Sequence, residues 1–494
     1  MALLLAGSAG CVAAPVSSPG DAAAVEDPSW HCFTAADAGE RRQRVERDIL
    51  PRVVFEGRSP PATLDDRMAH HKVPALSVAV IRQGALDWTS AYGRLGPEGA
   101  PAGCDSLFHA GSLAKPVTLL AVLRMREAGI IDLDRDVERY LRSYRLPPGR
   151  QTPSNPVTLR NLLAHTSGIT PGGYRGYAAG EAIPTDQQVA SGTGPTNSPK
   201  VEVLSPPGEA LQYSGGGYTV VEIALQDSLR RPFEQIAREW VLAPVGMKQA
   251  EFTQPLPPTS AVQAAKGFDA DGQPVRGGWH THPEQAAAGL WATPSDLASF
   301  LVELWNGYHG RSRVFNAAII QEMLRNPIDG HAYGFRLIGD GDQTFITHYG
   351  GNVGYTAGMT INLVTGNGAV FMTNSDAGTK LGLEFLQSVS RVYDWPVFRE
   401  TRVKAVDHSP DVLQSLVGRY RFAEQGWQVS VVVEAGSLTL VFPNGDRYAL
   451  VAISDGPREF IHPATAVRAG FDPTETETRL RLYGAVGIRE VASE

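Results

Sequence analysis

The chain is short of lysine and cysteine, and its basic residues form no block. It has 494 residues and a net charge of −8, so the charge pattern typical of nucleic-acid binding is absent and we expect no nucleic-acid partner. After the first 14 residues, no apolar stretch reaches the ~20 residues that a membrane-spanning helix needs. The length exceeds what one hydrophobic core usually supports, which predicts two domains.

The N-terminal segment has the composition of an export signal. Residues 1–14 (MALLLAGSAGCVAA) are apolar and rich in small residues, but they lack the usual basic start. The stretch Ser8-Ala9-Gly10-Cys11 also resembles a lipidation motif, with Ser8 where leucine is usual. We expect an exported protein, either secreted to the periplasm or anchored to a membrane through a lipidated Cys11. Residues 15–40, rich in Ala, Pro, Ser and Asp, are predicted to be a linker.

The chain has three cysteines. If Cys11 carries lipid, Cys32 and Cys104 remain as an even pair. An oxidising compartment permits a disulfide between them, and we state that bridge as a hypothesis.

The character of the sequence changes after about residue 400, and residues 41–400 are predicted to form one large domain. The helix expected to follow residue 112 is apolar on nearly every side, which is typical of a buried helix. Residues 171–200 show no clear periodicity, and so long a loop inside a domain is usually functional or mobile. The predicted elements are strands at 75–81, 86–92, 359–364 and 369–373, and helices at 41–50, at 113–128, after Gly217 and near Pro294.

Residues 405–494 have a different pattern. Short β runs recur at 427–433, 438–442, 448–453 and 479–483, with no helix signal of length. This region is predicted to be a small C-terminal antiparallel β domain or barrel.

Ser112 and Lys115 stand three residues apart at the start of the predicted buried helix, and therefore on one face of it. Lys115 is the only one of the seven lysines with a serine three residues before it. Burying an ammonium is costly unless it is paired or neutralised, and an uncharged lysine is a competent base for a serine hydroxyl. The pattern predicts a nucleophile with its base. The alternative is an N-capping serine followed by a lysine that extends to solvent.

Two further motifs carry polar groups beside glycines. In Tyr213-Ser214-Gly215-Gly216-Gly217, a phenol near Lys115 could act as its acid/base partner. In His348-Tyr349-Gly350-Gly351, a strand edge could line a cleft and offer a backbone N–H, and the histidine could donate to a carboxylate or to the tyrosine. Taken singly, a core tyrosine and a structural histidine are the alternatives.

Together and in this order, these three motifs resemble those of the serine β-lactamase and penicillin-binding hydrolase superfamily. The resemblance, to the branch of class C β-lactamases, D-Ala-D-Ala carboxypeptidases and family VIII esterases, spans roughly residues 45–395. It implies an α/β (α+β) fold: an antiparallel sheet flanked by helices, with an all-helical lobe and a cleft at the nucleophile helix.

The resemblance also implies a role for each matching residue. Ser112 would be the acyl-accepting nucleophile, with Lys115 and Tyr213 as base and acid partners. His348 and Gly350 would contact the substrate, and His348 stands where a lysine or histidine binds its carboxylate. The backbone amides of Ser112 and Gly351 would form the oxyanion hole. Neither a metal nor another cofactor is implied, and the expected partner is a small-molecule or peptide substrate.

The chain departs from the family pattern at two places. Gly215 stands where the family often has an asparagine that holds the substrate acylamide, and His348 replaces the lysine of a Lys-Thr-Gly motif. Both departures argue against efficient β-lactam hydrolysis and favour a peptidase or an esterase. The substrate classes that stay open are a D-amino-acid peptide, a β-lactam and a small ester. The alternative function is a catalytically weak penicillin-binding or sensing protein.

Other histidines are given structural interpretations. His280-Thr-His282-Pro-Glu284 holds three candidate zinc ligands, but Pro283 and the lack of a helical i, i+4 pair argue against a metal site and favour a loop at the cleft edge. His70-His71 is expected to be solvated. His165 is expected to be structural, with local hydrogen bonds from neighbouring hydroxyl groups.

Overall fold

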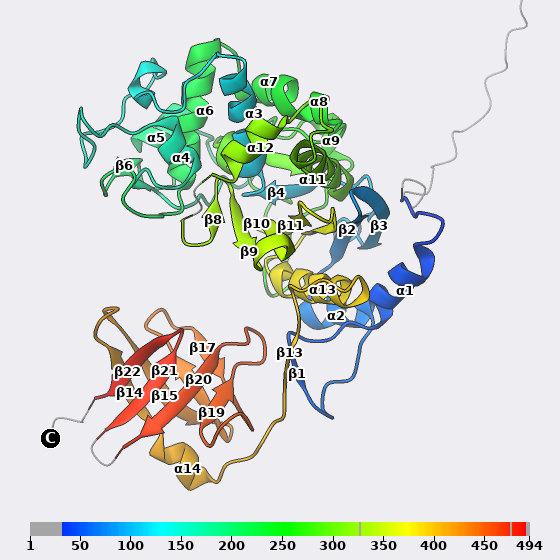
Figure 1. The fold of residues 1–494 in the computed structure, drawn as a ribbon, viewed down its shortest axis with the longest axis vertical. Coiled ribbons are helices and arrows are strands. Elements are labelled where there is room, and N and C mark those ends of the chain that lie inside the picture. The colour runs from blue at the N-terminus through cyan, green and yellow to red at the C-terminus, as the bar shows by residue number, and fades with distance from the viewer. Residues whose placement is uncertain (1–31, 326–327, 475–476, 491–494) are drawn as a thin grey trace, which may run out of the picture.

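The computed structural model describes residues 32–325, 328–474 and 477–490. These residues form a large domain, in which helices flank an antiparallel sheet, and a separate C-terminal barrel (Figure 1). The expected fold class is therefore confirmed. Over the described ranges, no helix combines the length and apolar character needed to cross a membrane.

The large domain is built on a seven-stranded sheet with antiparallel pairing throughout. The predicted strand pair and the predicted late hairpin are both present in it. In sheet order the strands are β3 (Ala85–Gly93), β2 (Ala75–Arg82), β12 (Gly368–Thr373), β11 (Tyr355–Asn362), β10 (Phe345–Asn352), β9 (Phe335–Ile338) and β8 (His331–Ala332).

Both faces of this sheet are covered, because alternate residues of its central strands are apolar on each side. On β2, Ala75, Ala79 and Ile81 belong to one core cluster, while Leu76 and Val80 belong to the other. The second cluster includes side chains of α1 (Gly39–Arg47), α2 (Leu64–His71) and α13 (Gly378–Val392), and the first includes those of α11 (Pro294–Tyr308) and of the helical lobe.

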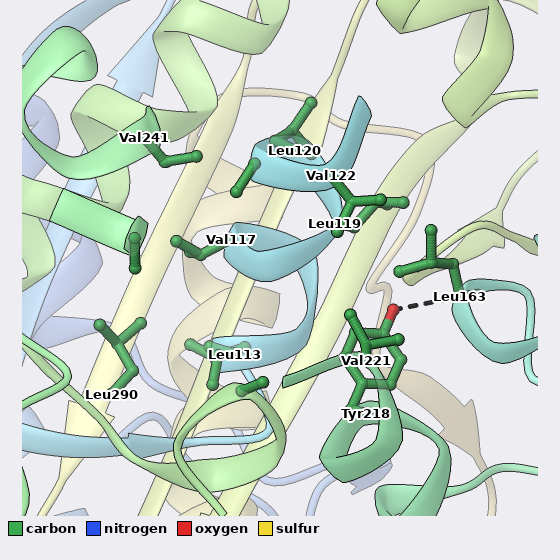
Figure 2. Close-up of a cluster of buried hydrophobic side chains, with 14 of the residues drawn as sticks. Leu113, Val117, Leu119, Leu120, Val122, Leu163, Tyr218, Val221, Val241 and Leu290 are labelled. Atoms are coloured by element: carbon green, nitrogen blue, oxygen red, sulfur yellow. Dashed lines mark hydrogen bonds between the residues drawn. The ribbon is translucent and has the colours of Figure 1, made fainter. Parts of the chain in front are cut away.

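The predicted buried helix is α3 (Ala114–Glu127), at the centre of the helical lobe. Figure 2 shows Val117, Leu119 and Leu120 on different sides of it, each facing apolar neighbours from other elements. The remaining helices of the large domain are α4 (Leu159–Leu163), α5 (Asp186–Ser191), α6 (Gly215–Leu229), α7 (Phe233–Ala237), α8 (Ala243–Val245), α9 (Pro258–Ala261), α10 (Gln285–Ala288) and α12 (Ala317–Met323), with 3₁₀-helical turns at Val137–Arg139 and Gly341–Gln343 and a π-helical turn at Arg238–Leu242.

Helix starts follow local capping chemistry. The helix expected after Gly217 begins earlier, at Gly215, because the Ser214 hydroxyl accepts a hydrogen bond from the Gly217 amide at 2.8 Å. The helix expected near Pro294 is α11, and Thr293 and Asp296 cap it reciprocally. The 171–200 segment is a loop apart from α5.

The C-terminal domain is an antiparallel barrel. Consecutive strands pair with each other except β17 and β18, and β22 pairs with β14. The edge strands β17 and β18 are separated only by Leu450, so one nearly continuous strand pairs with β16 and then with β19, and the sheet closes. The strands are β14 (Gly418–Phe422), β15 (Trp427–Glu434), β16 (Ser437–Val441), β17 (Arg447–Ala449), β18 (Val451–Ile453), β19 (Glu459–Ile461), β20 (Arg468–Pro473), β21 (Thr478–Leu482) and β22 (Ala485–Arg489), preceded by helix α14 (Pro410–Ser415).

A short backbone segment joins the two domains. Strand β13 (Thr401–Val403) pairs in parallel with β1 (Val53–Phe55) of the large domain. The next residues bond to the barrel: the Ser454 amide donates to the Lys404 carbonyl at 2.9 Å, and the Val406 amide to Ala452 at 3.0 Å.

The N-terminal part of the described chain is also attached to the large domain. Cys32 and Cys104 form the hypothesised disulfide. The Ala35 amide donates to the carbonyl of Asp87 on β3 at 2.8 Å. Residues 32–38, which fall within the predicted linker, are therefore held against the sheet. Cys11 lies outside the described residues.

Candidate active site

The site begins at the N-terminal end of α3. Ser112 precedes the helix in a turn, and the N-cap is Leu113, which makes no side-chain cap. Lys115 is 2% exposed, and its Nζ donates to Ser112 Oγ at 3.0 Å. The alternative is therefore wrong: Ser112 does not cap the helix, and Lys115 does not extend to solvent.

Helix α10 holds the Lys115 amine in place. Lys115 Nζ also donates to the carbonyl of Ala287 at 2.8 Å, and in the part of the chain that the structure describes no carboxylate lies within ion-pair distance of it. The same helix is fixed by Glu222, which accepts from the Ala286 amide at 2.8 Å. Burial raises the pKa of Glu222 well above its usual value. A short buried helix therefore orients the amine toward Ser112.

Tyr213 lies beside the lysine. Lys115 Nζ is 4.9 Å from the centroid of its ring, and Tyr213 is 43% exposed, which leaves the ring accessible to a bound molecule. His165 supports it from behind, with ring centroids 4.4 Å apart, and His165 Nδ1 accepts from the Ser214 amide at 3.1 Å. His165 is structural, but its partner is this backbone amide rather than a neighbouring hydroxyl group.

His348 lies on β10, with its ring centroid 6.3 Å from that of Tyr213. Burial and, second, the charge of Lys115 lower the pKa of His348 to about 3. At neutral pH the imidazole is uncharged, so it can donate one hydrogen bond but adds no positive charge beside Ser112.

The glycines of β10 permit a close backbone approach to the Ser112 turn. A Cβ on Gly350 would collide with the Ala110 carbonyl, and one on Gly111, which has φ +54°, would lie 2.7 Å from the Gly351 nitrogen. Asn352 and Tyr355 are the hydrogen-bonded pair that closes a two-residue turn between β10 and β11. The adjacent pair, Gly351 and Thr356, is therefore a non-hydrogen-bonded pair, and the Gly351 N–H points away from β11. The free N–H of Gly351 and the amide of Ser112 thus lie on neighbouring backbones.

The 171–200 loop fills the space beside Gly215, where the family often has an asparagine side chain. A Cβ there would lie 3.1 Å from both the Tyr174 ring and the Gly172 carbonyl. The Gly215 amide donates to that carbonyl at 2.9 Å, and the Tyr174 hydroxyl bonds to Thr219 at 2.7 Å. The loop therefore occupies the space that a side chain at position 215 would need.

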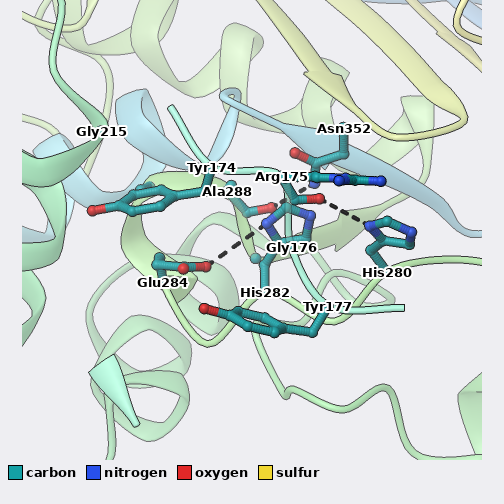
Figure 3. Close-up of polar contacts among 12 residues, drawn as sticks. Tyr174, Arg175, Gly176, Tyr177, Gly215, His280, His282, Glu284, Ala288 and Asn352 are labelled. Carbon is teal, nitrogen blue, oxygen red and sulfur yellow. Dashed lines mark hydrogen bonds and ion pairs between the residues drawn. The ribbon is translucent and has the colours of Figure 1, made fainter. Parts of the chain in front are cut away.

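The His280-Thr-His282-Pro-Glu284 segment is buried beneath this loop rather than exposed at a cleft edge (Figure 3). His282 Nδ1 lies 3.8 Å from Glu284 Oε2, and His280 Nδ1 is 2.9 Å from the Arg175 carbonyl oxygen. Burial lowers the pKa of His282 to about 3 and raises that of Glu284 to about 7. Across the described ranges, no three His, Cys, Asp or Glu side chains are arranged to hold a metal ion.

Sequence reasoning missed two polar residues next to the site. Asn352 donates to the Ala288 carbonyl at 3.0 Å and lies 2.9 Å from His109 Nδ1. His109, on β4 (Phe108–Gly111), stacks on Trp291 of β7 (Leu290–Ala292) with ring centroids 4.5 Å apart. Neither residue belongs to a recognisable motif, although His109 stands only three residues before Ser112 in the sequence.

The expectation for His71 was wrong. His70 is exposed, but His71 Nε2 lies 3.1 Å from Glu384, which also accepts from Arg67 at 2.7 Å. This contact between α2 and α13 joins segments more than 300 residues apart, so local sequence gave no signal for it.

Comparison with known proteins places the chain in a family. A sequence model of the β-lactamase family matches residues 61–384. The chain belongs to the β-lactamase family. Penicillin-binding protein 4* of Bacillus subtilis (strain 168) is 24% identical over 394 residues, covering 72% of this chain and 83% of that one. Esterase EstB of Burkholderia gladioli is 28% identical over 44% of this chain and 55% of its own.

Solved structures agree on the fold. The octameric penicillin-binding protein homologue from Pyrococcus abyssi matches with a TM-score of 0.58 at 18% identity, covering 86% of this chain and 98% of that one. The D-alanine carboxypeptidase AmpC from Burkholderia cenocepacia matches with a TM-score of 0.54 at 16% identity, covering 72% of this chain and 99% of that one. The β-lactamase family comprises serine hydrolases of amide and ester bonds, so hydrolase chemistry is the family's general property.

Proposed function

We propose that the protein hydrolyses an amide or ester bond through an acyl-enzyme on Ser112. The observation that carries the proposal is the buried Lys115 amine, 3.0 Å from Ser112 Oγ and without a carboxylate neighbour in the described chain. A buried lysine that contacts a serine hydroxyl in this way is a means of activating that serine.

The reaction divides into two halves. Ser112 Oγ bonds to the substrate carbonyl carbon, and its proton passes to the Lys115–Tyr213 pair. The amides of Ser112 and Gly351 donate to the resulting oxyanion. The leaving group takes the proton and departs, which leaves an ester on Ser112. Water then attacks that ester by the same steps and releases the acid.

Two features favour a peptide or a small ester over a β-lactam. The space beside Gly215 is filled by Tyr174 and Gly172, so no side-chain amide stands there for a substrate acylamide. His348 is uncharged and can donate to a carboxylate only as a neutral partner. Relatives named D-alanyl-D-alanine-carboxypeptidase/endopeptidase AmpH and Esterase EstB have these two substrate types.

The deciding experiment is intact mass after incubation with a penicillin and, separately, with a p-nitrophenyl ester. Ser112→Ala is compared with wild type, and Ser154→Ala, which alters an exposed serine, is the matched control. A Ser112-dependent adduct or ester turnover is expected. Equal turnover by Ser112→Ala would refute the proposal. A penicillin adduct that persists, with no ester or peptide turnover, would instead favour a penicillin-binding or sensing protein, the role suggested by the filled space at Gly215.

Export from the cytoplasm is part of the proposal. A Cys32–Cys104 bridge forms readily only in an oxidising compartment, which supports secretion to the periplasm or anchoring there through Cys11. Metabolic labelling with a palmitate analogue should mark wild type but not Cys11→Ser. If the protein is exported but not labelled, it is secreted, and the proposed lipid anchor at Cys11 is refuted.

A further inference from the structure

A cavity of about 480 Å³ lies on the reverse side of the sheet from Ser112. Tyr349 of β10 lines it, while its neighbours His348 and Gly350 lie on the face of the strand toward Tyr213 and the Ser112 turn, because successive residues of a strand point to opposite faces. The other walls come from β9, from α13 and from the residues just before β13, whose positions are visible in Figure 1. The volume is within the range of sites for small organic molecules.

The cavity is basic. Arg52, Arg336 and Arg399 line it. Arg399 is paired with the exposed Asp394 at 2.7 Å, but Arg52 and Arg336 make no ion pair within the part of the chain that the structure describes. Burial raises the pKa of Tyr349, and the charges of Arg336 and Arg52 oppose that rise. Both arginines therefore act on the Tyr349 hydroxyl in the cavity wall.

The neighbouring carboxylates are directed elsewhere. Glu384 pairs with Arg67 at 2.7 Å, and Glu400 pairs with Arg402 at 2.6 Å. The charges of Arg52 and Arg336 are therefore not paired by the described side chains around them.

The wall also contains an unused acceptor. Gln387 on α13 is 6% exposed; its Nε2 donates to the Arg399 carbonyl at 3.3 Å, and its Oε1 has no partner. A buried carbonyl oxygen without a donor is costly, so a donor supplied by a ligand would be stabilising there. Leu337, Leu383 and Phe398 provide apolar surface beside it.

We infer that this cavity binds a small organic anion that combines a carboxylate, an amide N–H and an apolar group, in the manner of an N-acyl amino acid. The carboxylate would be held by Arg52 and Arg336, the N–H would donate to Gln387, and the apolar group would lie against Leu383 and Phe398. This cavity is separate from the Ser112 site, and the inference does not depend on the proposed hydrolysis.

The probe is N-benzoylglycine, titrated calorimetrically into the full chain and into Ser112→Ala. Equal affinity is expected for these two proteins, and a loss of about tenfold or more for Arg52→Gln/Arg336→Gln, because charge-assisted bonds to the carboxylate are removed. Arg142→Gln, which alters an exposed arginine of the helical lobe, is the matched control and should bind as wild type does. Unchanged affinity in the double variant, or no binding to any protein, would overturn the inference.

Two further measurements locate the probe. Gln387→Leu should weaken N-benzoylglycine several-fold but leave benzoate, which has no N–H, unchanged; equal weakening of both would overturn the assignment of Gln387. Reaction of Ser112 with a fluorophosphonate, verified by mass, should leave probe binding intact, whereas loss of binding would place the probe at the Ser112 site. If Ser112 does not react, the proposed function fails while the arginine variants still decide this site.

Discussion

The large domain and the C-terminal barrel bury different chemistry. Among the described residues of the barrel, the buried polar side chains are two threonines, Thr439 and Thr478. The large domain buries Lys115, His348 and Glu284, among many others. Apolar interiors suffice for stability, whereas buried titratable groups are costly and tend to cluster at functional sites. The contrast points to the N-terminal end of α3 as the functional part of the molecule.

The largest expected effect is that of removing the buried amine. Lys115→Met should lower kcat/KM for a p-nitrophenyl ester by roughly 10²–10⁴-fold, the contribution typical of an acid–base group. Stability should be unchanged or higher, because methionine fills the space without the cost of burying a polar amine. Steady-state kinetics and thermal unfolding measure the two effects. The exposed Lys248→Met is the control, and equal activity of the two variants would contradict the assignment.

The reverse pattern is expected in the barrel. Leu440 on β16 is fully buried, so Leu440→Ala should cost about 2–5 kcal/mol of barrel stability while ester turnover at 25 °C stays unchanged. Denaturant unfolding measures the loss, and Val433→Ala, at a position 37% exposed, should change little. A parallel loss of turnover would show that the Ser112 site depends on the core of the barrel.

A smaller effect concerns pH. Burial raises the pKa of Glu284 from 4.5 in the unfolded chain to about 7, so its contribution to stability is complete below pH 4.5 and lost as pH rises through 7. Glu284→Gln should therefore gain stability relative to wild type between pH 4.5 and 7, by on the order of 1–3 kcal/mol, and level off above. The lowered pKa of His282 acts in both proteins and cancels in the difference. A flat difference across this window, matching that of the exposed Glu209→Gln, would contradict the prediction.

The smallest effect should come from the loop. Gly215→Asn places a side chain against Tyr174, so it should displace the loop and raise KM several-fold with little change in kcat. The double variant Gly215→Asn/Tyr174→Ala makes room for the new side chain and should recover part of that loss. No change in KM for either variant would mean that the loop does not border the bound substrate.

Sequence reasoning succeeded where local patterns determine structure. The uniformly apolar helix is α3, the strand predicted at 75–81 is β2, and the alternating runs form the late hairpin of β11 and β12. The barrel's closure could not be predicted, because it depends on β22 pairing with β14 and on a break at Leu450 within the run predicted at 448–453. Pairings between distant segments leave no local trace in a single sequence.

The candidate site follows the same division. The motifs that hold Ser112, Lys115, Tyr213 and His348 were visible as short patterns, and the structure brings them together. The partners that orient them were not visible, because the Ala287 carbonyl is a backbone group and Asn352 lies outside every motif. Position 215 illustrates both points, since the absent asparagine was evident but the tyrosine that fills its space was not.

The backbone of residues 401–406 has a consequence for how the molecule moves in solution. Its first half is bonded to β1 and its second half to β18, and Val53, Val403, Ile453 and Ile461 share one apolar cluster across the junction. A free hinge would let the barrel reorient independently on the nanosecond scale. With these bonds in place the two domains should tumble as one particle, with a single rotational correlation time set by the mass of both.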